Sequence, residues 1–257
     1  MAHAVITAGT KGIGRRAAET LLEKGYSVTI NYRSDEQAAG ALKKAHSQNL
    51  KQLQFVKADM TKKSEIDRLF NTVMERFGRI DLLVNNAGPF VTEGKRVIDH
   101  TDAEWRYLID GNLSSVFYLV KQIIPVMREQ RFGRIINYGF QEAGQASGWM
   151  NHGPFAAAKS ALASLTRTLA IEEAEHGITV NMVCPGIIKG RMKEATILEA
   201  ERAGEYVTPL GRAVSGEDIA RLIAFLCEND SEMINGAVID LTGTVDVVHR
   251  FLPRFFD

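Results

Sequence analysis

The chain has 257 residues, of which 45% are hydrophobic and 24% are charged, proportions typical of soluble globular proteins. This length suits one large α/β domain or two small ones. Lysine plus arginine and aspartate plus glutamate both number 31, so the formal net charge is zero. This balance argues against nucleic acid or an anionic membrane surface as the main partner.

The only two cysteines, Cys184 and Cys227, have neither the spacing of a metal site nor that of a redox CxxC motif. We therefore expect no metal and a reduced, cytoplasmic location. The first residues lack the basic and apolar regions of a signal peptide, and no run of 18 apolar residues predicts a membrane span.

Short apolar runs alternate with helical patterns along most of the chain. The predicted strands cover residues 4–8, 27–32, 53–57, 82–86, 134–138, 179–183 and 237–241. The predicted helices cover residues 15–24, 37–47, 64–76, 105–128 and 156–175. The alternation predicts one doubly wound, Rossmann-like α/β domain over residues 1–257, with about seven parallel strands and helices on both faces of the sheet.

Two segments near the end of the chain have a different character. Residues 187–209 lack strand character and stand where a mobile lid over a pocket is expected. Residues 249–257 form an aromatic tail with phenylalanine at 251, 255 and 256. Because this tail is too apolar to stay in water, we expect it to pack against its own domain or a neighbouring subunit.

A glycine-rich loop, Thr7–Gly14 (TAGTKGIG), joins the first predicted strand to the first predicted helix. Small residues let the backbone approach a pyrophosphate, and the free N–H groups of a helix N-terminus attract its charge. Strand, glycine turn and helix in this order predict a dinucleotide site. Glycine turns also join strands to helices where no ligand binds, so the loop alone leaves both readings open.

Further motifs follow this loop in order. They are Asp59 after the third strand, Asn85-Asn86-Ala87-Gly88 after the fourth, Asn112 in the long helix, Lys159, and Pro185-Gly186 after the sixth strand. With this ordered set, residues 3–245 resemble the short-chain dehydrogenase/reductase family, and in pattern the 3-oxoacyl-acyl-carrier-protein reductases.

The resemblance implies a cofactor cradle. Residues 12–14 would face the pyrophosphate, residues 59–60 the adenine, residues 86–88 the adenine ribose, and Lys159 the nicotinamide ribose. The full set of expected cofactor residues is Thr7, Gly9, Thr10, Lys11, Gly12, Ile13, Gly14, Arg33, Ser34, Asp59, Met60, Asn86, Ala87, Gly88, Lys159, Pro185, Gly186 and Ile188.

The residues after the second strand bear on the choice between NAD and NADP. An acidic residue there would bind the ribose 2′-hydroxyl and repel a 2′-phosphate. The chain instead reads Asn31-Tyr32-Arg33-Ser34, and Lys11 adds a second cation in the glycine loop. Either cation alone is equally well explained as a solvated surface charge. Together, without an acid in place, they favour NADP(H).

The resemblance also implies four catalytic side chains: a tyrosine that donates a proton, a lysine, a serine that holds the substrate oxygen, and an asparagine. Asn112 and Lys159 match the asparagine and the lysine. Phe155 stands at the tyrosine position and Phe140 at the serine position. Loss of a general acid lowers rates about 10²–10⁴-fold, and loss of an oxyanion donor about 10²–10³-fold.

Other groups near these positions are possible replacements for the acid. Strand alternation predicts that Tyr138 shares a face with Phe140, and His152 and Glu142 are close in sequence. Ser147, the next serine after Phe140, is not expected to replace the missing serine. We interpret Tyr138 as a packing residue, and His152 and Glu142 as polar residues of a loop, in preference to a role as replacement acid.

The chain departs from the family pattern at three further places. Ala8 replaces the first loop glycine, Gly190 replaces a threonine, and Gly243-Thr244 replaces a glycine pair.

Two functions therefore stand side by side. The first is an NADP(H)-linked oxidoreductase for a 3-oxoacyl thioester or small carbonyl compound, with conventional reduction strongly impaired. The alternative is a non-catalytic NADP(H)-binding pseudoenzyme that acts as a sensor, a scaffold or a partner subunit of an active paralogue. The resemblance implies a homo-oligomer, a tetramer or dimer, formed through the long helices.

Overall fold

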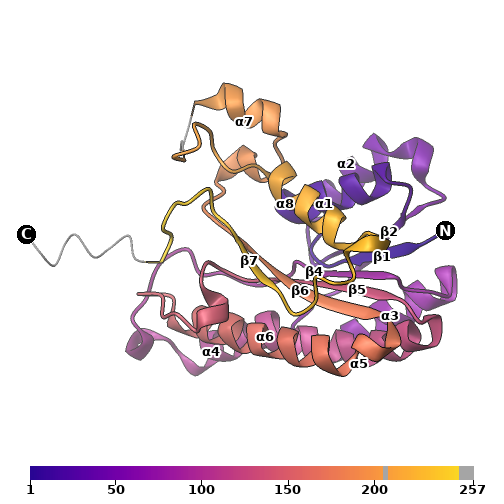
Figure 1. Cartoon of the computed structure of the whole chain (residues 1–257), viewed down its shortest axis with the longest axis horizontal. Coiled ribbons are helices and arrows are strands. Elements are labelled where there is room, and N and C mark those ends of the chain that lie inside the picture. The colour runs from indigo at the N-terminus through magenta and orange to yellow at the C-terminus, as the bar shows by residue number, and fades with distance from the viewer. Residues whose placement is uncertain (205–207, 249–257) are drawn as a thin grey trace, which may run out of the picture.

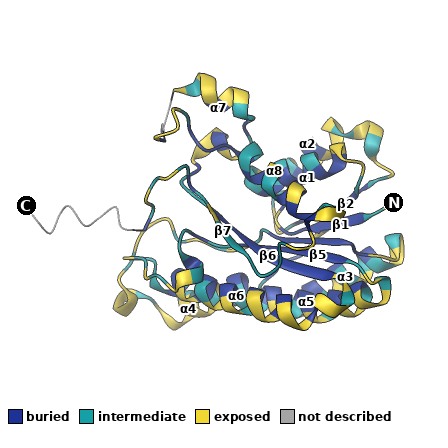
Figure 2. Ribbon diagram, viewed as in Figure 1, coloured by how far each residue is buried: buried dark blue, intermediate teal, exposed yellow. Residues whose placement is uncertain are grey.

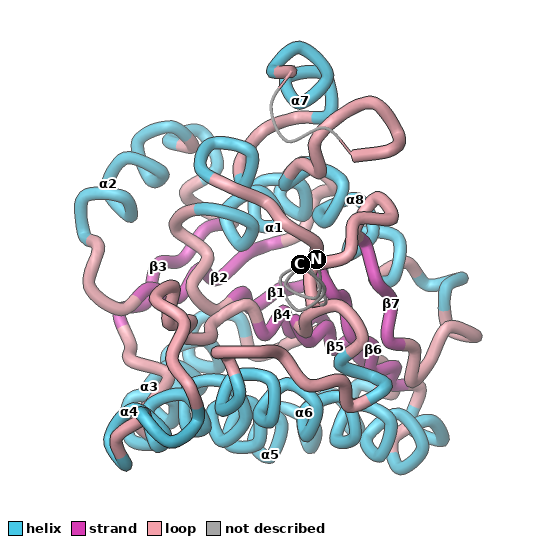
Figure 3. Tube along the Cα trace, turned by 90° about the vertical axis from the view of Figure 1, so that its left-hand side faces the viewer, coloured by secondary structure: helices cyan, strands magenta, loops and turns pink. Residues whose placement is uncertain are grey.

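The structure, a computed structural model, describes residues 1–204 and 208–248, so the aromatic tail lies outside the described residues. Its centre is a parallel sheet in the strand order β3-β2-β1-β4-β5-β6-β7 (Figure 3). The strands are β1 (His3–Ile6), β2 (Ser27–Tyr32), β3 (Leu53–Lys57), β4 (Leu82–Asn85), β5 (Gly133–Tyr138), β6 (Ile178–Pro185) and β7 (Val238–Leu241).

Helices cover both faces of this sheet, with α1, α2 and α8 on one side and α3 to α6 on the other (Figure 1). They are α1 (Gly12–Glu23), α2 (Glu36–Ala45), α3 (Lys63–Phe77), α4 (Asp102–Ile109), α5 (Ser115–Gln130), α6 (Gly153–Glu172), α7 (Ile197–Ala203) and α8 (Gly216–Leu226). The predicted doubly wound, Rossmann-like fold is confirmed.

The central strands are buried on both faces, which explains why they read as continuous apolar runs rather than as alternating patterns. Every residue of β1, β4 and β5 is buried, whereas β7 at the sheet edge is only partly covered (Figure 2). Two apolar layers result, one under α1 and α8 and one over α3, α5 and α6. The layers hold the carboxyl ends of the strands in fixed positions, and the loops of the site begin there.

The predicted long helix over 105–128 is interrupted. It divides into α4, a π-helical turn at Asp110–Ser114, and α5. Asn112 lies in this turn, and its side-chain Nδ2 donates to the Leu108 carbonyl at 2.9 Å. An asparagine side chain competes with the helical backbone in this way, and π turns occur often at functional sites.

The segment predicted as a lid, residues 187–209, contains two helical pieces. A 3₁₀ turn covers Gly190–Lys193, and α7 follows with a capping box between Thr196 and Glu199. Residues 205–207 are not described. Helix α8 lies outside the predicted helices, and it begins with a capping box between Ser215 and Asp218.

Candidate nucleotide and active site

The loops that follow β1 and β4 meet where the strand order of the sheet reverses. Strands β1 and β4 are neighbours, and ligands of open α/β sheets bind in the crevice at such a point. The Ala87 N–H donates to Thr7 Oγ1 at 2.8 Å. Asn86 Nδ2 donates to the carbonyls of Thr7 and Ala8, both at 3.0 Å. The two loops are therefore held together as one rigid unit.

Three glycines of this unit are required by the structure. Gly12 has a φ of +63°, a value that other residues rarely adopt. A Cβ on Gly14 would lie 2.3 Å from Asn86 Nδ2, and a Cβ on Gly88 would lie 2.3 Å from Asn112 Oδ1. Glycine at positions 14 and 88 therefore allows the close contacts with Asn86 and Asn112 that hold the two loops together.

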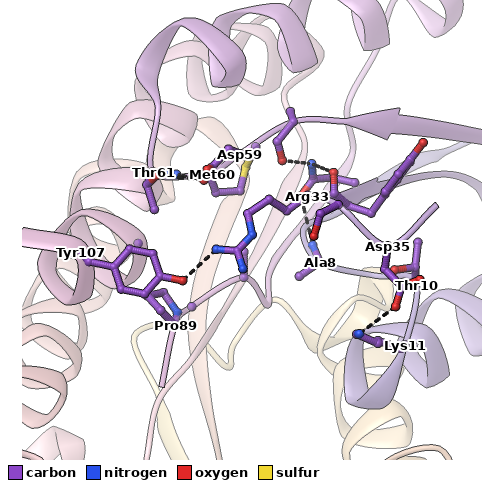
Figure 4. Close-up of a pocket in the computed structure, with 17 residues that line it drawn as sticks. Ala8, Thr10, Lys11, Arg33, Asp35, Asp59, Met60, Thr61, Pro89 and Tyr107 are labelled. Atoms are coloured by element: carbon purple, nitrogen blue, oxygen red, sulfur yellow. Dashed lines mark hydrogen bonds and ion pairs between the residues drawn. The ribbon is translucent and has the colours of Figure 1, made fainter. Parts of the chain in front are cut away.

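A cavity of about 260 Å³ opens beside this unit, at the carboxyl end of β2 (Figure 4). Eight of the predicted cofactor residues line it: Thr10, Lys11, Arg33, Ser34, Asp59, Met60, Ala87 and Gly88. Its size and its place after β2 suit the adenosine half of a dinucleotide.

Both predicted cations of this cavity have partners. Arg33 Nη1 donates to Tyr107 Oη at 2.7 Å, and this hydrogen bond raises the pKa of Arg33 (Figure 4). Lys11 Nζ lies 2.9 Å from Asp35 Oδ2, and the hydrogen bond from Lys11 lowers the pKa of that carboxyl. Two cations, Lys11 and Arg33, and two carboxylates, Asp35 and Asp59, line the cavity, so the formal net charge of its wall is zero.

Sequence reasoning missed Asp35 and Tyr107. Asp35 is the N-cap of α2, and its Oδ1 accepts from the Ala38 N–H at 2.9 Å. An acidic residue directly before a predicted helix was a readable signal for this cap. Tyr107 comes from α4, 74 positions from Arg33, and nothing local in the sequence indicates that the two meet.

The wall of the cavity after β3 is held by its own side chains. Asp59 Oδ1 accepts hydrogen bonds from the Thr61 N–H at 2.9 Å and from Thr61 Oγ1 at 2.8 Å. The Asp59 N–H donates to Glu65 Oε2 at 2.8 Å. Met60 is buried beside them. The loop predicted to face the adenine is therefore ordered without a ligand.

Asn112 is fully buried at the other end of the crevice. Its Nδ2 donates to the carbonyls of Pro89 and Leu108, each at 2.9 Å. Its Oδ1 is buried and accepts no hydrogen bond from the described residues. A buried acceptor of this kind normally has a partner, so this oxygen is suited to a water molecule or a ligand donor.

Lys159 lies close to the same point, on α6. The structure gives its ammonium no hydrogen bond among the described residues, and burial lowers its pKa to about 8. A Cβ on Gly88 would lie 3.3 Å from Lys159 Nζ and 2.3 Å from Asn112 Oδ1. The two predicted catalytic residues that match the family are thus brought together at Gly88.

The two phenylalanines singled out in the sequence belong to an aromatic cluster formed by Phe90, Phe140, Trp149, His152 and Phe155. Phe140 stacks on Trp149 with ring centroids 5.5 Å apart, and Phe155 meets Phe90 edge to face at 4.9 Å. The Phe140 and Phe155 centroids are 6.1 Å apart. Lys159 Nζ lies 5.7 Å from the Phe155 centroid. The floor beside Lys159 is therefore apolar.

Comparison with known proteins decides the family. The family model described as Enoyl-(Acyl carrier protein) reductase matches residues 7–243, nearly the whole chain. The chain belongs to the short-chain dehydrogenase/reductase family. This agrees with the resemblance carried by the ordered motifs.

Individual relatives cover almost the full length. A Bacillus subtilis (strain 168) protein named as an oxidoreductase, YtkK, is 58% identical over 97% of this chain and 98% of its own length. The 3-oxoacyl-[acyl-carrier-protein] reductase FabG of Escherichia coli (strain K12) is 35% identical over 95% of this chain and 97% of its own. A solved Bacillus thuringiensis structure described as a 3-oxoacyl-reductase is 53% identical, with a TM-score of 0.91, over 97% of this chain and 100% of that one.

Tyr138 does not share a face with Phe140 in this short-chain dehydrogenase/reductase, so that expectation is wrong. Strand β5 ends at Tyr138, and the chain then turns, which breaks the alternation. Tyr138 packs in the layer under α1 and α8, whereas Phe140 packs in the layer over α6. The Tyr138 hydroxyl is buried without a partner among the described residues, and burial raises its pKa.

The other groups near the catalytic positions are engaged in local contacts. His152 stacks on Phe90 with centroids 4.8 Å apart, and burial lowers its pKa, with a smaller contribution from His100. Ser147 Oγ donates to Glu142 Oε2 at 2.8 Å. These contacts hold the loop between β5 and α6 in shape.

The segment after β6 forms the remaining side of the crevice. Gly186 is packed so closely that a Cβ would lie 2.7 Å from Thr242 Cα. Pro185 pairs with Leu241 of β7, and Ile188 is buried. Gly190 has a φ of +49°, which suits glycine at this departure from the family pattern.

Among the described residues, no helix is long and apolar enough to span a membrane.

Proposed function

We propose that this chain is an NADP(H)-binding short-chain dehydrogenase/reductase in which conventional carbonyl reduction is strongly impaired. The observation that carries the proposal is the packing of Phe140 and Phe155 in the aromatic cluster beside Lys159 and Asn112. These phenylalanines stand at the positions where the resemblance implies a serine and a tyrosine, and neither ring carries a hydroxyl.

The chemistry of the site supports this impairment. The cofactor, when bound, supplies or accepts a hydride, and addition of a hydride to a carbonyl creates an alkoxide that must be held and protonated. Lys159 still offers a donor for the ribose hydroxyls of the cofactor. The ring nearest to Lys159 Nζ in the aromatic cluster is that of Phe155, 5.7 Å away, and this ring carries no hydroxyl. The residues retained therefore favour cofactor binding over rapid turnover.

NADP(H) is favoured over NAD(H) by the cavity after β2. Arg33 is oriented by Tyr107 and lies at the wall of this cavity, and a guanidinium matches a phosphate in shape and charge. Lys11 lies in the same cavity and is paired with Asp35. We therefore expect Arg33 to contribute more than Lys11 to binding a 2′-phosphate.

The substrate class rests on the relatives. The names of the E. coli and B. thuringiensis relatives refer to 3-oxoacyl reduction. A 3-oxoacyl thioester or another small carbonyl compound is therefore the proposed ligand.

A second function is favoured by the same aromatic cluster. Its rings pack against one another at centroid distances of 4.7–6.1 Å, so they fill the space in which a proton donor would stand. A non-catalytic NADP(H)-binding protein, acting as a sensor, a scaffold or a subunit of an active paralogue, needs the cradle and does not need the donor.

Fluorescence titration of NADPH, with turnover assays beside it, tests the proposal. We expect the wild type to bind NADPH more tightly than NADH and to turn over carbonyl substrates very slowly. The double variant Phe140→Ser/Phe155→Tyr should gain activity by about 10²-fold or more, because it restores an acid and an oxygen donor. The Arg33→Ala variant should lose most of the preference for NADPH.

The exposed Phe225 on α8 provides a matched control, since Phe225→Tyr adds a phenol away from the aromatic cluster. It should leave turnover at the wild-type level. Robust turnover by the wild type would refute the impairment, and the absence of NADPH binding would refute the nucleotide assignment.

The proposal extends to the assembly and the location of the protein. We propose a homo-oligomer, a tetramer or dimer, because Trp105 of α4 and Phe117 of α5 expose large aromatic side chains. A partner paralogue remains the alternative occupant of such a surface. Both free cysteines are buried, which fits the proposed cytoplasmic location.

A further inference from the structure

A side chain of the protein occupies the anion-binding end of α1. The Gly12 N–H, at the first residue of this helix, donates to Glu194 Oε1 at 2.7 Å. Arg15 Nη1 donates to the other carboxylate oxygen of Glu194 at 3.1 Å. A helix N-terminus binds phosphates and carboxylates by the same means, through free N–H groups and the positive end of the helix dipole.

The position is the one predicted for the pyrophosphate of the cofactor. The glycine loop of residues 12–14 belongs to the dinucleotide cradle, and Glu194 lies 182 positions further along the chain. Glu194 also lines a second cavity, of about 860 Å³, together with Gly12, Ile13 and Asn86. The carboxylate therefore stands in for the phosphate group that the loop is shaped to hold.

Packing holds Glu194 in this position. The neighbouring Lys193 carbonyl is pressed against the start of α8, where a Cβ on Gly216 would lie 2.1 Å from its oxygen. The Glu217 N–H donates to the Ala195 carbonyl at 3.2 Å. The segment that carries Glu194 is thus tied to the first turn of α8, and its carboxylate is directed to α1.

We propose that Glu194 is a built-in competitor of the cofactor, and that a dinucleotide binds by displacing its carboxylate and releasing residues 190–196 from α1. The proposal rests on the proposed nucleotide function. A diphosphate and a carboxylate cannot share the Gly12 N–H, and like charges within about 4–6 Å repel each other. The occupancy of the nucleotide site is thereby coupled to the position of the segment before α7.

The Glu194→Gln variant tests this coupling. Glutamine keeps the size of the side chain and an oxygen that accepts from Gly12, but it removes the charge that competes with phosphate. We expect NADPH to bind about 3- to 30-fold more tightly than to the wild type, the range of one charge at a helix N-terminus. Glu201→Gln, on the exposed side of α7, is the matched control and should leave the affinity unchanged.

A second measurement does not depend on the cofactor. Amide hydrogen exchange of Gly12, followed by NMR without ligand, should be at least about threefold faster in Glu194→Ala, because the amide loses its acceptor. In the wild type, saturating NADPH should speed tryptic cleavage after Arg191 and Lys193, which are already exposed, because release from α1 frees the backbone around them.

Unchanged or weaker NADPH binding by Glu194→Gln overturns the competition. Unchanged exchange at Gly12 in Glu194→Ala overturns the contact itself. Faster exchange at Gly12 without NADPH binding by any variant refutes the proposed nucleotide function, and displacement by a dinucleotide with it, while the Glu194–Gly12 contact stands.

Discussion

Ala8 is an alanine in a backbone conformation that favours glycine. Its φ is +51°, and its N–H donates to Asn31 Oδ1 at 3.1 Å, which fixes the turn between β1 and α1. The left-handed conformation is unfavourable by about 1–2 kcal/mol for a residue with a Cβ. The loop between β1 and α1 therefore carries a strain at Ala8 that a glycine at this position would avoid.

Replacing Ala8 by glycine should therefore stabilise the protein. We expect the Ala8→Gly variant to raise the free energy of unfolding by about 0.5–1 kcal/mol, the relief of strain less the added freedom of glycine in the unfolded chain. Ala41→Gly, on the exposed face of α2, should lower it by about 0.5–1 kcal/mol. Urea denaturation measures both, and a destabilised Ala8→Gly protein would contradict the argument.

Phe155 and Lys159 are in contact through the ring of one and the ammonium of the other. They lie one turn apart on α6, so the ammonium meets the face of a phenyl ring rather than a phenol. Burial lowers the pKa of Lys159 to about 8, and no carboxylate among the described residues offsets this. Burial therefore makes the charged form of Lys159 less favourable than it is in water. An anionic or hydroxyl-rich ligand beside the ammonium would raise its pKa again.

Among the elements, α8 depends most clearly on its first residues. The Ser215 hydroxyl is buried, and it accepts from the Asp218 N–H at 3.3 Å while the Asp218 carboxylate accepts from the Ser215 N–H at 2.9 Å. Arg212 holds the same carboxylate with two hydrogen bonds of 2.7 Å. The capped end of α8 also presses on the segment that carries Glu194, so the cap supports the site as well as the fold.

Removing this buried cap should lower the stability of the protein more than removing the cap of an exposed helix. We expect Ser215→Ala to lower the free energy of unfolding by about 1–2 kcal/mol, because the Asp218 carboxylate loses a donor and the half-buried Asp218 N–H loses its acceptor. Thr196→Ala removes the equivalent cap of the short, exposed α7 and should cost less, about 0.5 kcal/mol. Thermal denaturation compares the two variants, and equal losses would contradict a role for burial.

For the whole molecule, the first strand couples folding to pH. His3 lies in β1, between β2 and β4, with its ring stacked on Phe77 at 3.9 Å and its Nε2 3.0 Å from Thr29 Oγ1. Burial lowers the pKa of His3 from 6.5 to about 4, and the opposing attraction of Asp81 is smaller. The folded protein therefore holds this imidazole in its neutral form.

Stability should consequently fall in mild acid. Because the pKa of His3 is lower in the folded than in the unfolded state, its contribution is complete above pH 6.5 and is lost as the pH falls from 6.5 towards 4. The loss reaches about 3 kcal/mol, from the size of the pKa difference. Urea denaturation between pH 7.5 and 4.5 measures it. His3→Gln should show a shallower pH dependence, and an identical slope would exclude His3 as the cause.

Much of this protein could be predicted from local patterns. The strand–helix alternation predicted the parallel sheet, because buried parallel strands and amphipathic helices each leave a distinct periodicity. A shared helix face for Phe155 and Lys159 was readable from their spacing, since residues four apart on a helix are neighbours. The Ser215–Asp218 capping box was also readable, although the helix that it begins was not assigned.

Other features exist only in the folded chain. Tyr107 orients Arg33 across 74 positions, and Glu194 reaches Gly12 across 182. Tyr138 faces away from Phe140 because β5 ends between them. Periodicity reports which face of its own element a residue occupies. Contacts between elements depend on where strands end and on how crossover connections and packed helices bring distant segments together. The tertiary structure alone decides these contacts.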